Sequence, residues 1–349
     1  MALSPDFDPD GPGMGDGLFG LPLDPEACAV QVIPVPWEAT ASYGRGTAGG
    51  PAAVLDASQQ VDLHDLDFGD FWRAGVGLLP VDPTIPAAAA EVEADALAVI
   101  AAGGPSGAPS LAAARDRVDA ASRLVSASVE ATAEAVLARG CVPAVLGGDH
   151  SAPLGLLRAV ARRHPGVGIL HIDAHADLRV AYLGFAEAHA SIMHNALELP
   201  GVARLVGVGW RDVGQAEVAR ASSDPRIVPI WDRDLARSAL SGRSFARVVE
   251  GIIAALPAAV HVSFDIDGLD PMLCPGTGTP VPGGLSFREV SFLLARVASE
   301  RRIVSFDLCE VAPAGDGGEW DANVGARVLY KLAGAALRSA DTGWSADLG

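Results

Sequence analysis

The chain has 349 residues, half of them hydrophobic, and a formal net charge of −18 at pH 7. That length allows one large domain or two ordinary ones. The acidic balance argues against nucleic acid or an anionic membrane surface as a partner, and no apolar stretch reaches the roughly 18 residues that span a bilayer.

The N-terminal stretch MALSPDFDPDGPGMGDG has no basic segment followed by an apolar one, so no signal peptide is expected. It is acidic and rich in Gly and Pro, which predicts a flexible leader over residues 1–25. Residues 26–345 are expected to form a single α/β domain, with an insertion or helical excursion at 84–110 around the loop AAGGPSGAPS. The four cysteines are scattered without a CxxC pair, which favours a reducing, cytoplasmic location.

Short β-branched runs alternate with longer, Ala-rich stretches along the rest of the chain. The predicted strands are 29–34, 75–80, 142–146, 167–172, 203–209, 226–231, 259–264 and 302–308. The predicted helices are 111–139, 153–163, 186–198, 214–222, 243–255, 286–299 and 322–339. This alternation predicts a mainly parallel sheet with helices on both faces, and spacing alone does not decide between an open sheet and a closed barrel.

Acidic and histidine-bearing motifs follow three of these strands. VPAVL runs into GGDHS, VGILHI runs into DAHAD, and AVHVSF runs into DIDGLDP. Because the carboxyl ends of parallel strands lie at one edge of a sheet, the three motifs are expected to converge. The candidate metal ligands are two histidines and four carboxylates: His150, His175, Asp173, Asp177, Asp265 and Asp267.

Four buried carboxylates without compensating cations would repel one another and could not all ionise. Arg179 is the nearby basic residue, and one arginine is not enough. Divalent metal ions resolve the conflict, and six ligands are too many for one ion unless some bridge two ions about 3.5–4 Å apart. Mixed carboxylate and imidazole ligands favour Mn(II) over thiolate-held zinc. Two Mn(II) per subunit are therefore expected, with Ni(II) as a possible substitute.

Each motif alone has a simpler interpretation. In GGDHS, the simpler interpretation is that Asp149 or Ser151 caps a helix, and DIDGLDP is typical of a turn. All three motifs, each directly after a predicted strand, favour a shared site over coincidence.

Taken in order, GGDHS, DAHAD and SFDIDGLDP resemble the ureohydrolase superfamily, which includes arginase, agmatinase, guanidinobutyrase, guanidine hydrolase and formiminoglutamase. VPWEATASYGRGTAGGPAAVLDAS, PGTGTPVPGGLSFRE and FDLCEVAP also resemble segments of that family, so the resemblance covers about residues 28–340. It implies a three-layer α/β/α fold with a mostly parallel, open, eight-stranded sheet, which selects against the barrel. It also implies a homotrimer or homohexamer.

The resemblance distributes the ligands between two ions. One ion takes His150, Asp173, Asp177 and Asp265, and the other takes Asp173, His175, Asp265 and Asp267. Asp173 and Asp265 therefore bridge, as the number of ligands requires.

The implied reaction is hydrolysis of a guanidino compound to urea and an amine. By the resemblance, Asp177 orients the water activated between the ions, Glu310 binds the guanidinium group, and His189 shuttles a proton to the leaving amine. A histidine at a helix end is the simpler interpretation of His189, and His194 is a second candidate for the shuttle.

Two positions differ from the arginine-cleaving members. Those enzymes hold the amino-acid head of arginine with an Asn and an Asp, where this chain has Arg179 and Gly214. The differences favour a small cationic guanidino substrate without that head, agmatine first, then guanidine or 4-guanidinobutyrate, and after them formiminoglutamate or arginine. Arg179 would either bind a substrate carboxylate or form a structural ion pair, and Trp210 is a candidate for narrowing the pocket.

Two other classes of protein remain as alternatives. A dinuclear metallophosphoesterase would also use Asp and His clusters, but it needs cationic clamps for phosphate, and none stands out. A non-catalytic metal-binding relative would have lost a ligand or the catalytic histidine, whereas the six ligands, His189 and Glu310 are all present.

Overall fold

A computed structural model of the chain describes residues 7–13, 15–105, 107–315 and 317–339. Residues 1–6 and 14 of the predicted leader and 340–345 of the predicted domain lie outside these ranges. Eight strands form one sheet in which every pairing is parallel. The strands are β1 (Val30–Val35), β2 (Val76–Leu78), β3 (Val142–Gly147), β4 (Val167–Ile172), β5 (Val202–Val208), β6 (Ile227–Ile230), β7 (Ala259–Asp265) and β8 (Arg302–Cys309).

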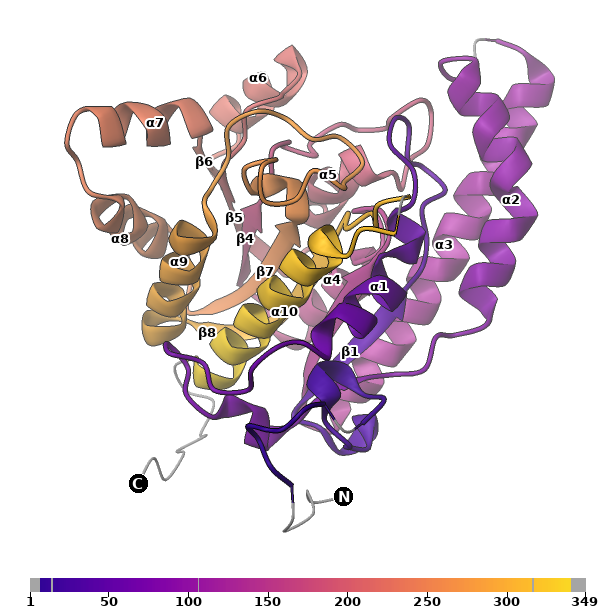
Figure 1. Ribbon diagram of the computed structural model, residues 1–349. Coiled ribbons are helices and arrows are strands. Elements are labelled where there is room, and N and C mark those ends of the chain that lie inside the picture. The colour runs from indigo at the N-terminus through magenta and orange to yellow at the C-terminus, as the bar shows by residue number, and fades with distance from the viewer. Residues whose placement is uncertain (1–6, 14, 106, 316, 340–349) are drawn as a thin grey trace.

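Helices cover both faces of this sheet (Figure 1). The α-helices are α1 (Gly50–Ser58), α2 (Thr84–Ala101), α3 (Pro109–Ala138), α4 (Leu154–Arg163), α5 (Ile192–Leu197), α6 (Gln215–Ser223), α7 (Asp232–Leu240), α8 (Phe245–Ala255), α9 (Phe287–Glu300) and α10 (Trp320–Arg338). Short 3₁₀ turns are η1 (Leu18–Gly20), η2 (Pro25–Ala27), η3 (Thr47–Gly49), η4 (Phe71–Ala74), η5 (His189–Ser191) and η6 (Ile266–Gly268). The strand order is β2-β1-β3-β8-β7-β4-β5-β6, and β2 and β6 are free edges. The predicted open three-layer α/β/α fold is confirmed.

Alternation of apolar side chains along the strands builds two cores. In β1, Val30 and Val32 face the core shared with α1, α8, α9 and α10, whereas Ile33 and Val35 face the core shared with α2, α3, α4 and α5. Successive side chains of a strand point to opposite faces, so a sheet buried on both sides has apolar residues at nearly every position.

The strand order explains why the chemistry-bearing motifs converge. The strands β3, β8, β7 and β4 are consecutive neighbours in the sheet, although they are far apart in the chain. Their carboxyl ends carry GGDHS, Glu310, DIDGLDP and DAHAD respectively. The site therefore forms along one continuous stretch of the sheet edge.

Residues 84–110, expected as an insertion or helical excursion, contain α2, which packs along α3 as a helical hairpin. The structure departs from the sequence predictions in two other segments. The helix α7 was not predicted, and none of its residues is buried. Within the predicted leader, Leu18, Phe19 and Leu21 are buried in the core, so packed structure begins earlier than expected. No described helix is both long enough and apolar enough to cross a membrane.

Candidate metal centre

His150 lies at the centre of a cluster of carboxylates at the ends of β3, β4 and β7. Its Nδ1 atom is 3.1 Å from Asp173 Oδ2, 3.2 Å from Asp265 Oδ2 and 3.4 Å from Asp177 Oδ2. His150 is 1% exposed, and all three aspartates are buried. Three carboxylate oxygens thus lie within 3.4 Å of one imidazole nitrogen.

A second cluster adjoins the first through Asp173. The Nδ1 atom of His175 lies 3.1 Å from Asp267 Oδ2 and 3.4 Å from Asp173 Oδ1. Asp173 thus presents one oxygen to each cluster. The structure brings all six predicted ligands together, in two adjoining groups.

The electrostatics of this cluster fit bound cations. Burial, followed by repulsion from Asp267 and Asp173, raises the pKa of Asp265, and burial with repulsion from Asp173 raises that of Asp267. Burial alone would lower the pKa of His175, but the carboxylates of Asp173 and Asp267 raise it to about 12. Among the described residues, the ion-pair partners of the four aspartates are all histidines. Carboxylate oxygens and imidazole nitrogens in so negative a field suit divalent transition metal ions. Two groups of His and Asp side chains have ligand atoms close enough together to hold such an ion.

The backbone is strained where it presents two of the predicted residues. Asp177 has a φ of 52° and Glu310 a φ of 64°, a left-handed conformation that non-glycine residues seldom adopt. Such strain persists only where surrounding structure enforces it, and it is concentrated at functional sites. A Cβ on Gly148 would lie 1.9 Å from the Trp37 carbonyl oxygen, so close backbone approach requires the second glycine of GGDHS.

Glu310 faces the cluster from the end of β8. Its Oε1 atom accepts a hydrogen bond from the backbone N–H of His150 at 2.8 Å, and its side chain is buried. Burial raises its pKa well above the usual range, and the neighbouring Asp149 adds to the effect. A Cβ on Gly278 would lie 2.8 Å from Glu310 Oε2, so the PGTGTP segment leaves room for this carboxylate only because it is glycine there.

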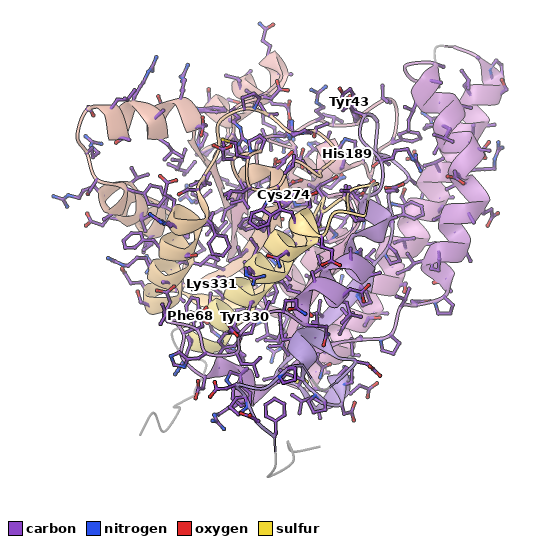
Figure 2. The ribbon with its side chains drawn as sticks, viewed as in Figure 1. Tyr43, Phe68, His189, Cys274, Tyr330 and Lys331 are labelled. Atoms are coloured by element: carbon purple, nitrogen blue, oxygen red, sulfur yellow. The ribbon has the colours of Figure 1, made fainter. Side chains whose placement is uncertain are left out.

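His189, labelled in the upper half of Figure 2, begins η5 and lines the same cavity as the cluster. Its Nδ1 atom lies 3.1 Å from Thr40 Oγ1, and Thr40 Oγ1 donates to Asp149 Oδ2 at 2.8 Å. Burial lowers the pKa of His189, which keeps its ring neutral at neutral pH. Sequence reasoning missed Thr40, since a threonine in a loop carries no distinguishing signal.

His171 was also missed, although it precedes DAHAD on the same face of β4. Its Nδ1 atom accepts a hydrogen bond from Trp210 Nε1 at 3.0 Å, and its Nε2 atom lies 2.8 Å from Asp173 Oδ2 in a close but bent contact. Trp210 is fully buried and contacts His171, so the prediction that it narrows the pocket is wrong. It sits behind the cluster because its ring packs over Gly207, where a Cβ would lie 2.1 Å from it.

A buried chain of polar groups extends from His150 into the sheet. His150 Nε2 lies 2.9 Å from Ser263 Oγ, which donates to Asp307 Oδ1 at 3.1 Å. Asp307 Oδ2 in turn contacts His261 Nε2 at 2.7 Å. Burial would raise the pKa of Asp307, but His150 and His261 lower it overall, so it is ionised.

The cavity over the cluster has a volume of about 150 Å³. Its lining includes Ser42, His150, His175, Asp177, Arg179, Tyr182, His189, Asp212, Glu217, Asp265, Thr279 and Glu310. Cluster ligands form its floor, while Arg179, Tyr182, Asp212 and Glu217 are neighbours along its wall. A volume of this size suits a small, narrow solute.

Arg179 is paired within the protein. Its Nε atom lies 3.5 Å from Glu217 Oε2, and its guanidinium group stacks 4.9 Å from the centre of the Tyr182 ring. Glu217 also accepts from the Leu178 and Gly214 backbone N–H groups. The structure therefore shows Arg179 in the structural ion pair that the sequence left as one of two interpretations.

His194 does not lie in the cavity. It is on α5, its Nδ1 atom contacts Arg220, and burial lowers its pKa. Of the two candidate histidines, only His189 lines the cavity.

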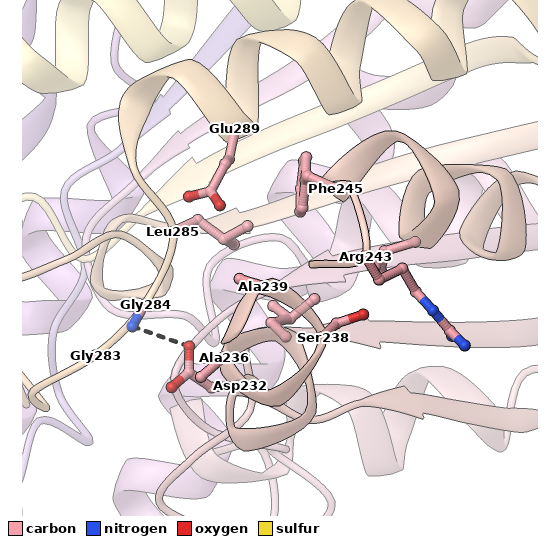
Figure 3. A pocket seen from close by; sticks show the side chains of 12 residues that line it. Asp232, Ala236, Ser238, Ala239, Arg243, Phe245, Gly283, Gly284, Leu285 and Glu289 are labelled. Carbon is pink, nitrogen blue, oxygen red and sulfur yellow. Dashed lines mark hydrogen bonds between the residues drawn. The ribbon is translucent and has the colours of Figure 1, made fainter. Parts of the chain in front are cut away.

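A separate cavity of about 220 Å³ lies between α7, α8, α9 and the loop at Gly283 (Figure 3). Asp232 Oδ1 accepts from the Gly284 backbone N–H at 3.1 Å, and Glu289 caps α9. Figure 3 shows Arg243 pointing away from the other lining residues. The two carboxylates that line this second cavity, Asp232 and Glu289, already have hydrogen-bond partners, and none of its described lining residues is a histidine. The cavity over the metal cluster is therefore the candidate site.

Comparison with known proteins agrees with this geometry. A profile of the Arginase family matches residues 28–334. The chain is 30% identical over 307 residues to the N(1)-aminopropylagmatine ureohydrolase of Synechocystis sp., a match that covers 88% of each chain. It is 34% identical over 212 residues to the guanidinobutyrase of Pseudomonas aeruginosa, covering 58% of this chain and 63% of that protein.

Solved structures share the fold. The agmatine ureohydrolase of Thermoplasma volcanium superposes with a TM-score of 0.69 at 23% identity, covering 95% of this chain and 96% of that one. The proclavaminate amidino hydrolase of Streptomyces clavuligerus gives a TM-score of 0.69 at 24% identity, covering 95% of this chain and 100% of that one.

Proposed function

The chain belongs to the Arginase family, whose named relatives are hydrolases of carbon–nitrogen bonds, and from this premise we propose that it hydrolyses a guanidino compound without an amino-acid head to urea and an amine. Agmatine is the proposed type of substrate. The observation that carries the proposal is that four of the six candidate ligands, together with Glu310 and His189, line one small cavity. The other two, Asp173 and Asp267, lie beneath it in the same clusters.

The proposed ligands are His150, Asp173, Asp177 and Asp265 for one ion, and Asp173, His175, Asp265 and Asp267 for the other. Two divalent cations, Mn(II) by preference and Ni(II) as a substitute, would supply activation of water at neutral pH. Asp173 supports bridging because its two oxygens already face different clusters.

The protein residues position the substrate and move protons. The buried carboxylate of Glu310 would accept paired hydrogen bonds from the guanidinium group and hold its carbon over the cluster. Asp177 would orient the attacking water. As water adds to that carbon and the bond to the substituted nitrogen breaks, His189 would deliver the proton that the leaving amine needs.

The wall of the cavity favours a substrate whose end opposite the guanidinium group, its tail, is cationic rather than anionic. Arg179 is neutralised by Glu217 and stacked on Tyr182, so it offers little free charge to a carboxylate. Asp212 lines the wall and is exposed, and no side-chain partner is recorded for it among the described residues. An amine tail would meet this carboxylate, which favours agmatine over 4-guanidinobutyrate and leaves guanidine as the tail-less alternative.

Urea release by metal-loaded protein tests the proposal. The panel is agmatine, 4-guanidinobutyrate, guanidine and arginine, with formiminoglutamate followed by formamide, each with Mn(II) and with Ni(II). We expect agmatine or a longer agmatine-like amine to be turned over best. If arginine is best, the reading of Arg179 and Gly214 is wrong, and silence across the panel with both ions bound supports a non-catalytic relative. The predicted cytoplasmic location and trimeric or hexameric assembly remain predictions.

The variant Arg179→Met separates the two charged tails. If Arg179 is only a structural ion pair, the variant retains agmatine hydrolysis, with KM unchanged or lower because one positive charge has left the wall. The opposite result is a wild-type enzyme that prefers 4-guanidinobutyrate and an Arg179→Met variant that loses activity on that substrate alone. In that case Arg179 binds the substrate carboxylate.

A further inference from the structure

Thr40 joins two residues that are distant in the chain. It lies in the loop between β1 and α1, is fully buried, and is 109 residues from Asp149 and 149 residues from His189. Its hydroxyl oxygen is 2.8 Å from Asp149 Oδ2, 3.1 Å from His189 Nδ1 and 3.1 Å from the backbone nitrogen of His189. Three polar partners thus share one hydroxyl group that has a single proton.

Asp149 is placed to accept hydrogen bonds only. Its Oδ2 atom accepts from the Thr40 backbone N–H at 3.2 Å, and its Oδ1 atom accepts from the Ser151 backbone N–H at 3.0 Å. A backbone N–H cannot accept, so each Asp149 oxygen is the acceptor in these contacts. The hydroxyls of Thr40 and Ser151 complete the set.

The single hydroxyl proton of Thr40 therefore goes to Asp149. The hydroxyl donates to Asp149 Oδ2 at 2.8 Å, which is its shortest contact, whereas His189 Nδ1 lies farther away at 3.1 Å. Thr40 Oγ1 is then left with lone pairs for His189. The backbone N–H of His189 donates to one of them, and Nδ1 must carry a proton in order to donate to the other.

We propose that Thr40, held by Asp149, is a positioning residue that fixes His189 in the Nδ1-protonated tautomer. The neutral ring then has its lone pair on Nε2, the nitrogen that accepts a proton and returns it to the leaving amine. The Tyr182 ring packs edge-on against His189, with centroids 5.4 Å apart, and restrains the imidazole from the other side. This inference rests on the proposed function, because it assigns His189 a proton-transfer role.

A double-mutant cycle tests the inference. The variants are Thr40→Val, His189→Ala and the double variant, and the readouts are kcat and KM for the best substrate of the panel, with bound metal measured for each. Thr40→Val should lower kcat by at least about 10-fold, up to the ~10²–10⁴-fold that a general acid–base contributes, while KM and metal content stay near the wild type. In the His189→Ala background the same change should cost almost nothing, because Thr40 acts through the missing ring.

Two further variants separate positioning from folding. Thr40→Ser retains the hydroxyl and should restore most of kcat. Thr47→Val is the matched control, since Thr47 is buried in the same loop region but bonds Glu38 rather than His189, and it should leave kcat unchanged.

The outcomes distinguish this inference from the function on which it rests. Wild-type kcat in Thr40→Val, or an equal loss in both backgrounds, overturns the role of Thr40 while urea release itself stands. No urea release by the wild-type chain with its metals bound overturns the proposed function, and the role of Thr40 falls with it.

Discussion

Replacing His171 should weaken metal binding without removing a ligand. Trp210 Nε1–H can only donate, so His171 Nδ1 must accept, and the proton of the neutral ring sits on Nε2 facing Asp173 Oδ2 at 2.8 Å. The Nε2–Asp173 contact lies outside hydrogen-bond geometry, so we take the low end of the effect that outer partners of metal ligands have. The variant His171→Phe should therefore weaken metal affinity roughly 10-fold.

Competition with a fluorescent chelator measures that affinity. The Mn(II) dissociation constants of His171→Phe and Trp210→Phe are compared with those of the wild type, and the Trp210 variant should show the smaller loss because His171 remains. Trp231→Phe is the matched control, since Trp231 packs edge-on against Trp210 and no hydrogen bond to His171 is recorded for it. Two ions held by His171→Phe at wild-type affinity would refute the reasoning.

Three other predictions follow from single groups. Glu310→Gln should lower kcat/KM by about 10²-fold with both ions retained, because one charge-assisted bond of the guanidinium pair is lost, and steady-state kinetics with metal analysis would check this; an unchanged kcat/KM would remove Glu310 from the site. Because burial lowers the pKa of His189, its base form persists on acidification, so kcat/KM under metal saturation should hold down to about pH 6.5 and fall only below it, and a fall centred above 6.5 would contradict this assignment. Burial raises the pKa of Cys28 to about 11 and raises those of Cys274 and Cys309, whereas Cys141 is partly exposed, so peptide mapping after iodoacetamide at pH 8 should find Cys141 labelled first.

The sheet was predictable from the sequence because its strands are buried on both faces. Runs such as VGILHI have no polar alternation, and Gly or Pro residues end them, so all eight strands were found. The order of the strands was not predictable, because a parallel crossover can pass over neighbouring strands. The helix α7 was missed because it buries no residue and so lacks the apolar stripe that marks a packed helix.

The six candidate ligands were predictable as residue types, and the outer groups were not. Spacing after strands placed His150, Asp173 and Asp265 at one sheet edge. Nothing local distinguishes Thr40 or Trp210, because each acts on a histidine more than 30 residues away, and only the folded chain brings them together.

His150 and His171 show how remote partners decide what a histidine does. Both rings approach Asp173, and both belong to one group of potential ligands. Ser263 donates to Asp307, so it accepts from His150 Nε2–H, and the Nδ1 atom that faces the carboxylates is the nitrogen that would bind a cation once it gives up its own proton. Trp210 reverses this arrangement in His171, where the nitrogen that faces Asp173 carries the proton and cannot bind a cation. The two histidines are the same residue type in the sequence, and the hydrogen bond on the far side of each ring favours His150 as a metal ligand and His171 as an outer partner of Asp173.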